Sequence, residues 1–346
     1  MRPVPSVRLW RRPLRGGAGL TDPSLVPALR PLLAGGAAFL LTFLVMPACL
    51  RLLRALRLQQ VVRRQGPAAH LAKDGTPTAA GLAFVPAACL AAWAAYPRSP
   101  TLLAALVVTL GHAALGFADD YLKVVRRRPE GLKARYKLIG QVLLTAWLVG
   151  FALAVRPEVQ ALLLPFTGLR WLIGPLAFTA LGALAVLGAT NGCNFNDGAD
   201  GLLGSTGAVA LIALGIIVWH LGDPSQAALA LAMAGALLAF LRWNWYPARV
   251  FMGDTGSMAV GAALAAIAVL SATTLYLPLL GLLFLLEVLS VIVQVGSFRL
   301  TGRRVLRMAP LNHHLQLSGW REGRLVPRLL VFALACAAVG LVAYLR

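Results

Sequence analysis

Long apolar stretches separated by short polar segments run along most of the chain. A transmembrane helix needs roughly 20 mostly apolar residues, and the sequence contains about ten such stretches. We predict membrane-spanning helices at 32–53, 78–96, 101–118, 138–155, 171–190, 206–221, 227–243, 258–275, 277–297 and 326–345. A transmembrane β-barrel would instead show short segments of alternating polarity. The pattern therefore predicts an all-α integral membrane protein.

The polar segments between these stretches alternate in charge. Basic residues crowd the loops 54–77, 119–137 and 298–325, whereas the intervening loops carry few. Because cytoplasmic loops are enriched in Lys and Arg, we expect these loops in the cytoplasm and both termini outside. The basic segment 1–30 disagrees, since such a segment usually stays inside. We expect a basic N-terminal tail over 1–30 and a single transmembrane domain over 31–346.

Composition supports a membrane protein. Of the 346 residues, 59% are hydrophobic and 13% charged, against about 25% charged in an ordinary soluble domain. The net charge of +20 is explained mostly by loop charge that sets topology, with anionic lipid or an anionic substrate as a second contributor. We expect no nucleic-acid partner. The four cysteines form no CxxC pair, so neither a disulfide framework nor a zinc site is predicted.

Carboxylates are scarce, and five of the twelve lie in three short clusters. These are Asp119 with Asp120, Asp197 with Asp200, and Asp254, all at predicted cytoplasmic ends of spans. Ionisable groups at membrane depth are costly, so a functional site is the default hypothesis. The alternative is that these acids are simply solvated residues at helix ends. That explanation would suffice for one Asp, but less well for five on one face.

The first cluster lies in the segment GFADDYLK, residues 116–123. Adjacent carboxylates repel unless a cation intervenes. Lys123 follows Asp119 by four residues, which places it within reach on a helical turn. A divalent metal would relieve the repulsion better, and Mg²⁺ prefers one or two carboxylates completed by waters and substrate phosphates.

The second cluster lies in NGCNFNDGADG, residues 191–201, where Asn194, Asp197 and Asp200 interrupt an apolar chain. Its glycines permit close approach of a ligand to the backbone. The Asn and Asp side chains are suited to a ribose or a base edge. A polar helix-breaking turn at the membrane surface is the alternative, which does not explain this density of polar residues.

The third cluster lies in NWYPARVFMGDTGS, residues 244–257. Asp254 stands between glycines and is a candidate metal ligand. Phe251 is suited to stacking on a base, although an aromatic at the membrane interface is the more usual role.

A fourth polar stretch, MAPLNHHLQLSGW at 308–320, contains the adjacent His313 and His314. Zinc sites usually space histidines by about three to five residues, so phosphate contact or proton transfer fits better. Lys73, beside GTPT at 75–78, adds a cation at the same face. Carboxylates for Mg²⁺, lysines for phosphates and polar loops for a nucleoside together predict phosphoryl transfer, where catalysis is mostly positioning and charge stabilisation.

Together these motifs resemble the polyprenyl-phosphate N-acetylhexosamine-1-phosphate transferase superfamily, and within it the phospho-N-acetylmuramoyl-pentapeptide transferases. The matching segments are KDGTPT (73–78), GFADDYLKVV (116–125), GLKARYKLIGQ (131–141), ATNGCNFNDGADGL (189–202), NWYPARVFMGDTGS (244–257) and SVIVQVGSFRLTGRRVLRMAP (290–310). The resemblance runs from about residue 70 to the C-terminus, and the stretch 32–53 fits the family's first helix.

The resemblance implies ten helices around a cytoplasmic-face cleft in a bacterial plasma (inner) membrane. It implies Mg²⁺-dependent transfer of phospho-MurNAc-pentapeptide from UDP to undecaprenyl phosphate, which releases UMP and forms lipid I. The oligomeric state stays open, a homodimer included. The lipid phosphate either attacks the donor directly or follows attack by an Asp that forms a covalent intermediate. We favour the direct route.

Roles for individual residues follow from the matching motifs. Asp254 would bind Mg²⁺, and Asp119 would be the candidate base or phosphate-facing carboxylate, with Asp120 beside it. The remaining assignments are Asn194, Asp197 and Asp200 at the nucleotide and phosphates, Phe251 on uracil with Asn244 nearby, Lys73, Lys123 and Lys137 at phosphates, and His313 and His314 at the sugar-phosphate end.

The chain departs from the family pattern at several positions. The family's three-His run reads Asn312-His313-His314, Asn196 replaces a Thr, Gln316 replaces an acid, and Ala79-Ala80 replaces Met-Gly. A paralogue that transfers another UDP-amino-sugar phosphate, such as GlcNAc-1-phosphate, is therefore the alternative. A transporter or structural protein is a further hypothesis, although transporters place charges near mid-membrane and often show inverted repeats. A lipid-linked sugar transferase of another fold would need a different pattern of acids.

Overall fold

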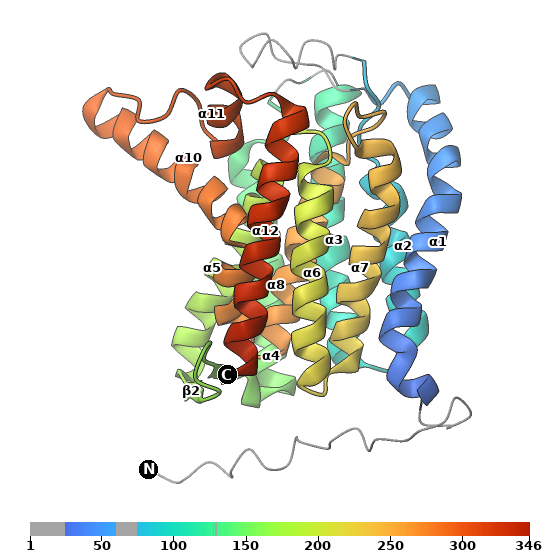
Figure 1. Cartoon of the computed structure of the whole chain (residues 1–346), viewed down its shortest axis with the longest axis vertical. Helices are drawn as coiled ribbons and strands as arrows, with labels where there is room; N and C mark the ends of the chain where they lie inside the picture. The colour runs from blue at the N-terminus through green and yellow to red at the C-terminus, as the bar shows by residue number, and fades with distance from the viewer. Residues whose placement is uncertain (1–24, 60–74, 127, 129) are drawn as a thin grey trace.

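The computed structural model describes residues 25–346 except 60–74, 127 and 129, and over that part it is a bundle of helices (Figure 1). The helices are α1 (Leu25–Ala55), α2 (Gly81–Ala95), α3 (Pro100–Val124), α4 (Ala134–Val155), α5 (Gly174–Asn196), α6 (Leu202–His220), α7 (Pro224–Asn244), α8 (Gly253–Leu270), α9 (Leu277–Leu280), α10 (Leu282–Thr301), α11 (Leu311–Leu317) and α12 (Glu322–Leu345). Lys73 and most of the tail 1–30 lie outside the described residues.

In the described part of the chain, nine helices are long and apolar enough to cross a membrane. They are α1, α3, α4, α5, α6, α7, α8, α10 and α12. The remaining predicted span corresponds to α2, which is apolar but only 15 residues long. These helices match the ten predicted spans in order, which confirms an all-α, multi-pass membrane protein.

Four predicted helix boundaries were wrong at the positions that matter for the site. α3 continues past 118 to Val124 and α5 past 190 to Asn196. α4 begins at Ala134 rather than 138, and α8 at Gly253 rather than 258. Hydropathy falls where polar residues begin. The helical backbone nevertheless continues here, because these polar side chains are paired inside the bundle. The acidic clusters therefore lie on or beside helix ends rather than in long loops.

Two further segments differ from the predicted pattern. Residues 171–173 are not helical. A short hairpin pairs β1 (Ala161–Leu163) with β2 (Arg170–Leu172) in antiparallel register, after the 3₁₀ turn η3 (Pro157–Gln160). The predicted span 258–275 ends early at Leu270 and is followed by the 3₁₀ turn η4 (Thr274–Tyr276).

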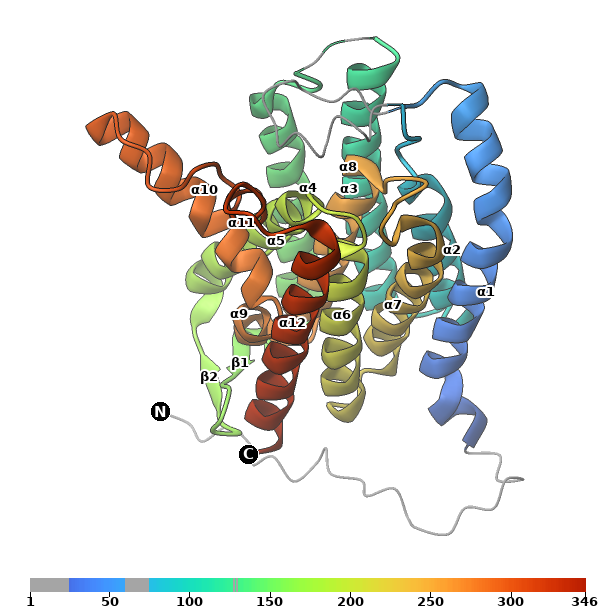
Figure 2. The ribbon, with the colours of Figure 1, turned by 45° about the horizontal axis from the view of Figure 1, so that its top comes forward.

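The predicted span 277–297 is divided in the structure. Gly281 separates the short α9 from α10, and α10 then diverges from the other helices (Figures 1 and 2). Only 17% of the most apolar window of α10 is buried, against 89% for α8. Within the described residues, α8 is therefore the centre of the bundle, whereas α10 is largely exposed.

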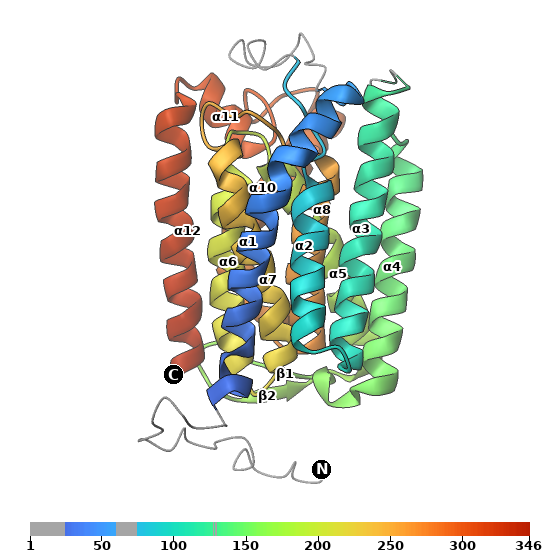
Figure 3. The same cartoon turned by 90° about the vertical axis from the view of Figure 1, so that its right-hand side faces the viewer.

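Small residues allow the helices to approach closely. α1 crosses in front of α2 and α7 (Figure 3), and a Cβ at Gly235 of α7 would overlap the backbone carbonyl of Gly35 in α1. Van der Waals packing of small residues is a main source of helix association in lipid. α1 begins and α12 ends at the hairpin end of the bundle, whereas α11 lies at the opposite end (Figure 1), as expected for an even number of spans.

Candidate active site

Asp120, on α3, caps the first turn of α8. Its Oδ1 accepts a hydrogen bond from the backbone N–H of Asp254 at 3.0 Å. Its Oδ2 accepts from the backbone N–H of Thr255 at 3.0 Å and from the Thr255 hydroxyl at 2.7 Å. The first amides of a helix have no partner within the helix, and a carboxylate there also complements the helix dipole. Both oxygens of Asp120 are thus engaged in fixing the position of Asp254.

Two glycines make this close approach of α3 and α8 possible. A Cβ at Gly116 of α3 would overlap the backbone carbonyl of Asp254. Gly253 has a φ of +69°, and a Cβ there would overlap Oδ2 of Asp120. A side chain at either position would push the start of α8 away from α3, because both contacts involve packed atoms.

Asp254 is the centre of a cluster of charged side chains. Its Oδ2 accepts from Nζ of Lys137 at 2.8 Å and from Nζ of Lys123 at 3.1 Å. Its Oδ1 accepts from Nδ2 of Asn194 at 2.8 Å. Helices α3, α4, α5 and α8 thus converge on one carboxylate, whose side chain is 16% exposed. The pairing of Lys137 and Asn194 with Asp254 joins motifs that are more than fifty residues apart.

Asp119 lies beside this cluster through the same lysine. The Lys123 ammonium pairs with Oδ2 of Asp119, which confirms the contact predicted from their spacing of four residues. Oδ1 of Asp119 accepts from the backbone N–H of Leu132 at 2.7 Å. Gly131 has a φ of +62° and packs on this carboxylate, because a Cβ there would lie 2.5 Å from Oδ1. One ammonium therefore bridges carboxylates from α3 and α8.

The carboxylates of this cluster suit a hard divalent cation whose coordination is completed by water and a bound substrate. Among the described residues, no three His, Cys, Asp or Glu side chains form a metal-binding group by themselves. Mg²⁺ needs only one or two carboxylates, with waters and substrate phosphates as its other ligands. Asp119 and Asp254 offer two carboxylates that already share a cation, the Lys123 ammonium.

The second acidic cluster divides into separate roles. Asn194 donates both to Asp254 and to Oγ of Ser257 at 2.9 Å, so it faces the charged cluster. Asp200 is buried, and its Oδ2 accepts from the backbone N–H of Ala248 at 2.9 Å. Asp197 is the partly exposed residue that follows α5. Of the three predicted residues, Asn194 is thus the one placed directly against Asp254 by a hydrogen bond in the described structure.

Asn244 joins two backbone segments beside the cluster. Its Oδ1 accepts from the backbone N–H of Gly201 at 3.1 Å, and its Nδ2 donates to the carbonyl of Val250 at 2.9 Å. The side chain is 1% exposed. Asn244 therefore holds the backbone directly before Phe251 in place, and its own amide does not face solvent. The side chain of Phe251 is half-buried.

The GTPT segment lies directly against the segment that carries Asp254. The backbone N–H of Phe251 donates to the carbonyl of Pro77 at 2.9 Å, and the carbonyl of Phe251 accepts from the N–H of Ala80 at 3.1 Å. The carbonyl of Met252 accepts from the N–H of Gly81 at 3.1 Å. The structure thus brings residues 75–81 to the same end of α8, although Lys73 itself is outside the described residues.

The two histidines lie on α11, which is tied to the last turn of α5 and to the loop that follows it. Nδ2 of Asn312 donates to the carbonyl of Phe195 at 2.9 Å, and Nε2 of Gln316 donates to the carbonyl of Gly198 at 3.4 Å. His314 accepts from the backbone N–H of Arg307 through Nδ1 at 3.2 Å. Both departures from the family pattern on α11 therefore bind the segment that contains Asn194 and Asp197.

The sequence analysis missed several residues that position the site. Glu287 of α10 is fully buried, and both its oxygens accept from the backbone N–H of Asn312 at 3.2 Å. It is the one acid within the predicted span 277–297, and an intramembrane acid is a signal that could have identified it. Thr255 and Ser257 carry no comparable signal, because hydroxyl side chains are common in transmembrane helices.

Comparison with known proteins defines the class of this site. A model of the glycosyl transferase family 4 matches residues 102–272, a range that includes all three acidic clusters. The chain is 43% identical over 317 residues to a phospho-N-acetylmuramoyl-pentapeptide-transferase of Moorella thermoacetica, covering 92% of this chain and 98% of the relative. It is 46% identical over 285 residues to one of Symbiobacterium thermophilum, covering 81% and 85%.

A third relative with the same name, from Geobacillus kaustophilus, is 40% identical over 321 residues, covering 91% of this chain and 98% of the relative. The chain belongs to the phospho-N-acetylmuramoyl-pentapeptide-transferase family. This assignment confirms the resemblance drawn from the motifs and disfavours a transporter or structural protein.

Proposed function

We propose that the protein transfers phospho-MurNAc-pentapeptide from UDP to undecaprenyl phosphate, which releases UMP and forms lipid I. The names of the relatives support this donor over a UDP-GlcNAc donor. The observation that carries the proposal is the convergence of Lys123, Lys137 and Asn194 on Asp254, with Asp119 beside it. Such a cluster provides fixed positive groups and metal-binding oxygens at one point, as phosphoryl transfer requires.

The charge balance of the cluster favours Mg²⁺ as a cofactor. The three carboxylates of Asp119, Asp120 and Asp254 and the two ammoniums of Lys123 and Lys137 sum to a formal −1. A negative site would repel a diphosphate. We propose that Asp119 and Asp254 hold Mg²⁺, which when bound neutralises charge on the transferring phosphates. Lys123 and Lys137, which pair with Asp254, are the cations placed to contact the phosphate oxygens.

We propose the direct route, in which the lipid phosphate attacks the donor. A phosphomonoester has a second pKa of about 6, so at neutral pH it is largely dianionic and needs little help from a base. Asp119 is also poorly placed as a nucleophile, because Leu132 and Lys123 occupy its two oxygens. Asp120 is engaged on both oxygens by α8, so in this proposal it positions Asp254 rather than acting on the substrate.

For the other predicted site residues, the proposed role depends on whether the side chain is buried or accessible. The half-buried Phe251 ring is the candidate surface for uracil, and Asn244 positions it. Asp197 is accessible enough to contact the donor, whereas the buried Asp200 orders the loop. His313 and His314 face the sugar-phosphate in this proposal, and Lys73 keeps its predicted phosphate role.

We propose that the α11 end of the bundle faces the bacterial cytoplasm, in the plasma membrane. The cluster around Asp254 lies at that end, where α8 begins and α3 ends. The basic loops that follow α3 and α10 support this side, because positively charged loops are retained in the cytoplasm.

Release of UMP by the purified protein tests the proposal. The protein in detergent is given Mg²⁺, undecaprenyl phosphate and either UDP-MurNAc-pentapeptide or UDP-GlcNAc. Asp254→Ala is the inactive variant, and Glu158→Gln, exposed in the turn directly before the hairpin, is the matched control. We expect release with the pentapeptide donor by wild type and control only. Release with UDP-GlcNAc alone would assign the alternative donor, and no release by folded protein would contradict the transferase reading.

A further inference from the structure

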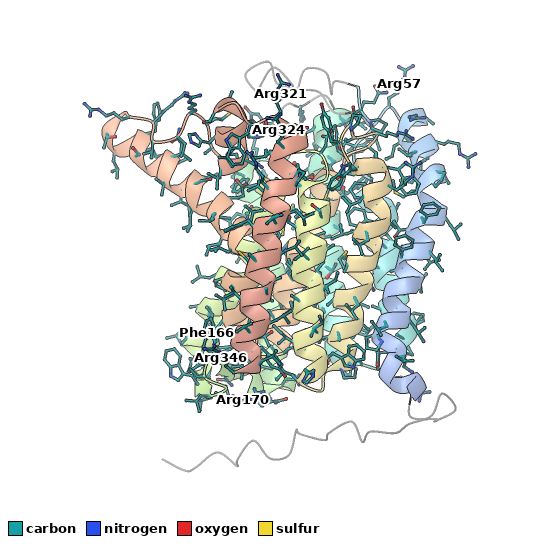
Figure 4. All side chains as sticks on the ribbon, in the orientation of Figure 1. Arg57, Phe166, Arg170, Arg321, Arg324 and Arg346 are labelled. Atoms are coloured by element: carbon teal, nitrogen blue, oxygen red, sulfur yellow. The ribbon has the colours of Figure 1, made fainter. Side chains whose placement is uncertain are left out.

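A second concave site lies at the start of α12 and shares no residue with the cluster around Asp254. It is a pocket of about 520 Å³. Its lining residues are Ser318, Gly319, Trp320, Arg321, Arg324 and Arg328. Figure 4 shows Arg321 and Arg324 at the α11 end of α12, at the opposite end of the bundle from Arg170 and Arg346. None of these residues has a role in the proposed transfer reaction.

The pocket is strongly positive. Its three arginines are exposed, and within the described residues no carboxylate pairs with any of them. Glu322, the acid nearest in sequence, is buried and does not line the pocket. The Arg328 guanidinium lies 4.7 Å from the centre of the Trp320 ring, a contact that orients the guanidinium without neutralising it.

The backbone adds to this character. Gly319 has a φ of +97°, and a Cβ there would meet no atom within 4 Å, so the pocket is open on that side. α12 begins next to it, at Glu322, and the residue before it, Arg321, makes no side-chain cap bond. The positive end of a 24-residue helix therefore reinforces the arginines. An anion is the ligand that these groups would bind.

The face of α12 below the pocket indicates what kind of anion. Arg324 and Arg328 share one face of α12, since side chains four residues apart lie in line, and Arg321 lies just before the first residue of the helix. The same spacing continues through Val331, Ala335, Val339 and Val342, all of them exposed. Because α12 is a membrane-spanning helix, this apolar stripe faces lipid. A positive pocket thus lies directly above a stripe suited to an acyl chain.

We propose that this pocket binds the phosphate group of an anionic membrane phospholipid, whose acyl chain lies along the stripe on α12. Guanidinium groups match phosphate oxygens in geometry and charge, and Trp320 is the type of residue enriched at the headgroup level. A soluble anion would gain nothing from the apolar stripe. The acceptor lipid must instead place its phosphate near Asp254 to react, so a bulk phospholipid is the better occupant.

Native mass spectrometry of the full-length protein in detergent tests the proposal. Dioleoyl phosphatidylglycerol is titrated onto wild type and onto the double variant Arg324→Gln/Arg328→Gln. Arg303→Gln/Arg304→Gln is the matched control, because it removes the same charge from exposed positions in the preceding loop. We expect the pocket variant to lose roughly tenfold or more in phosphatidylglycerol affinity, and the control less than about threefold. Arg324→Lys/Arg328→Lys should retain most of the binding, which separates charge from folding.

Three comparison ligands distinguish the sources of phosphate. Phosphatidylcholine should bind wild type and pocket variant alike, and inorganic phosphate should not compete with phosphatidylglycerol. Equal phosphatidylglycerol binding by wild type and pocket variant would overturn the proposal. So would competition by inorganic phosphate, or a loss confined to undecaprenyl phosphate, which would make the pocket an acceptor site.

Discussion

The carboxylate of Asp120 accepts the backbone N–H of Asp254 at 3.0 Å, and so joins the end of α3 to the beginning of α8. Its neighbour Asp119 is bound instead by Lys123 and the N–H of Leu132. Two adjacent acids of one motif thus have different environments. Asp120 acts on the fold of the site, whereas Asp119 belongs to its charged surface.

This division gives a first test with paired variants. Asp120→Asn should lower the apparent melting temperature, because an amide cannot accept all three bonds or complement the dipole of α8. The loss of a helix cap costs about 1 kcal/mol, up to about 2. Asp119→Asn should melt close to wild type yet lose most activity. Thermal unfolding in one detergent, together with UMP release, checks both. Greater destabilisation by Asp119→Asn than by Asp120→Asn would contradict the assignment.

The lysine cluster gives a second test. Lys137→Gln should lower kcat/KM for the UDP-linked donor by about 10²–10³, the range for removal of one preorganised charge-stabilising donor. Lys133 is the matched control, since it is exposed four residues earlier and makes no side-chain contact of this kind in the described structure. Steady-state UMP release should show Lys133→Gln within about twofold of wild type. Equal losses in both variants would show that general charge, rather than position, is important.

Some of the site could be predicted from sequence and some could not. The Asp119–Lys123 pair follows from helical spacing alone, and the structure confirms it. The convergence of Lys137 and Asn194 on Asp254 depends on how α4, α5 and α8 pack, which no local pattern encodes.

Helix ends were the weakest part of the sequence prediction. Hydropathy places the end of α3 at 118, because Asp119 and Asp120 are polar, but their partners on α8 and in the following loop allow the helix to continue to Val124. The division of the span 277–297 at Gly281 and the departure of α10 from the bundle likewise have no counterpart in the hydropathy pattern, which stays apolar through this stretch.

Asn312 gives a third test. The family pattern has a histidine here, but the Asn side chain is fully buried, and a Cβ at Gly198 would already lie 2.5 Å from its Nδ2. Asn312→His should therefore destabilise the protein by about 1–3 kcal/mol through overpacking. Asn312→Ser adds no volume, so we expect it to lower the apparent melting temperature less than Asn312→His does. An Asn312→His variant as stable and active as wild type would show that α11 is looser than the structure indicates.

The hairpin end of the bundle gives a fourth test, in which a substitution is expected to lower stability without affecting donor binding. Nη1 of Arg156 pairs with Oδ2 of Asp223 at 2.5 Å, and Oδ1 of Asp223 accepts from the hydroxyl of Ser225 at 3.0 Å at the start of α7. Asp223→Ala should destabilise by about 1–2 kcal/mol and leave KM for the donor unchanged. Melting temperature and steady-state kinetics of the same preparation check this. A raised KM would link this end of the bundle to the site.

Formation of lipid I as a function of Mg²⁺ concentration tests the central claim most directly. Product is measured by mass spectrometry for wild type and Asp254→Asn, with UDP-MurNAc-pentapeptide and undecaprenyl phosphate both saturating. We expect saturable dependence on Mg²⁺ for wild type, no product in EDTA, and a loss of at least about 10² in rate for Asp254→Asn. Full activity in EDTA, or an Asp254→Asn variant as fast as wild type at all Mg²⁺ concentrations, would contradict the account.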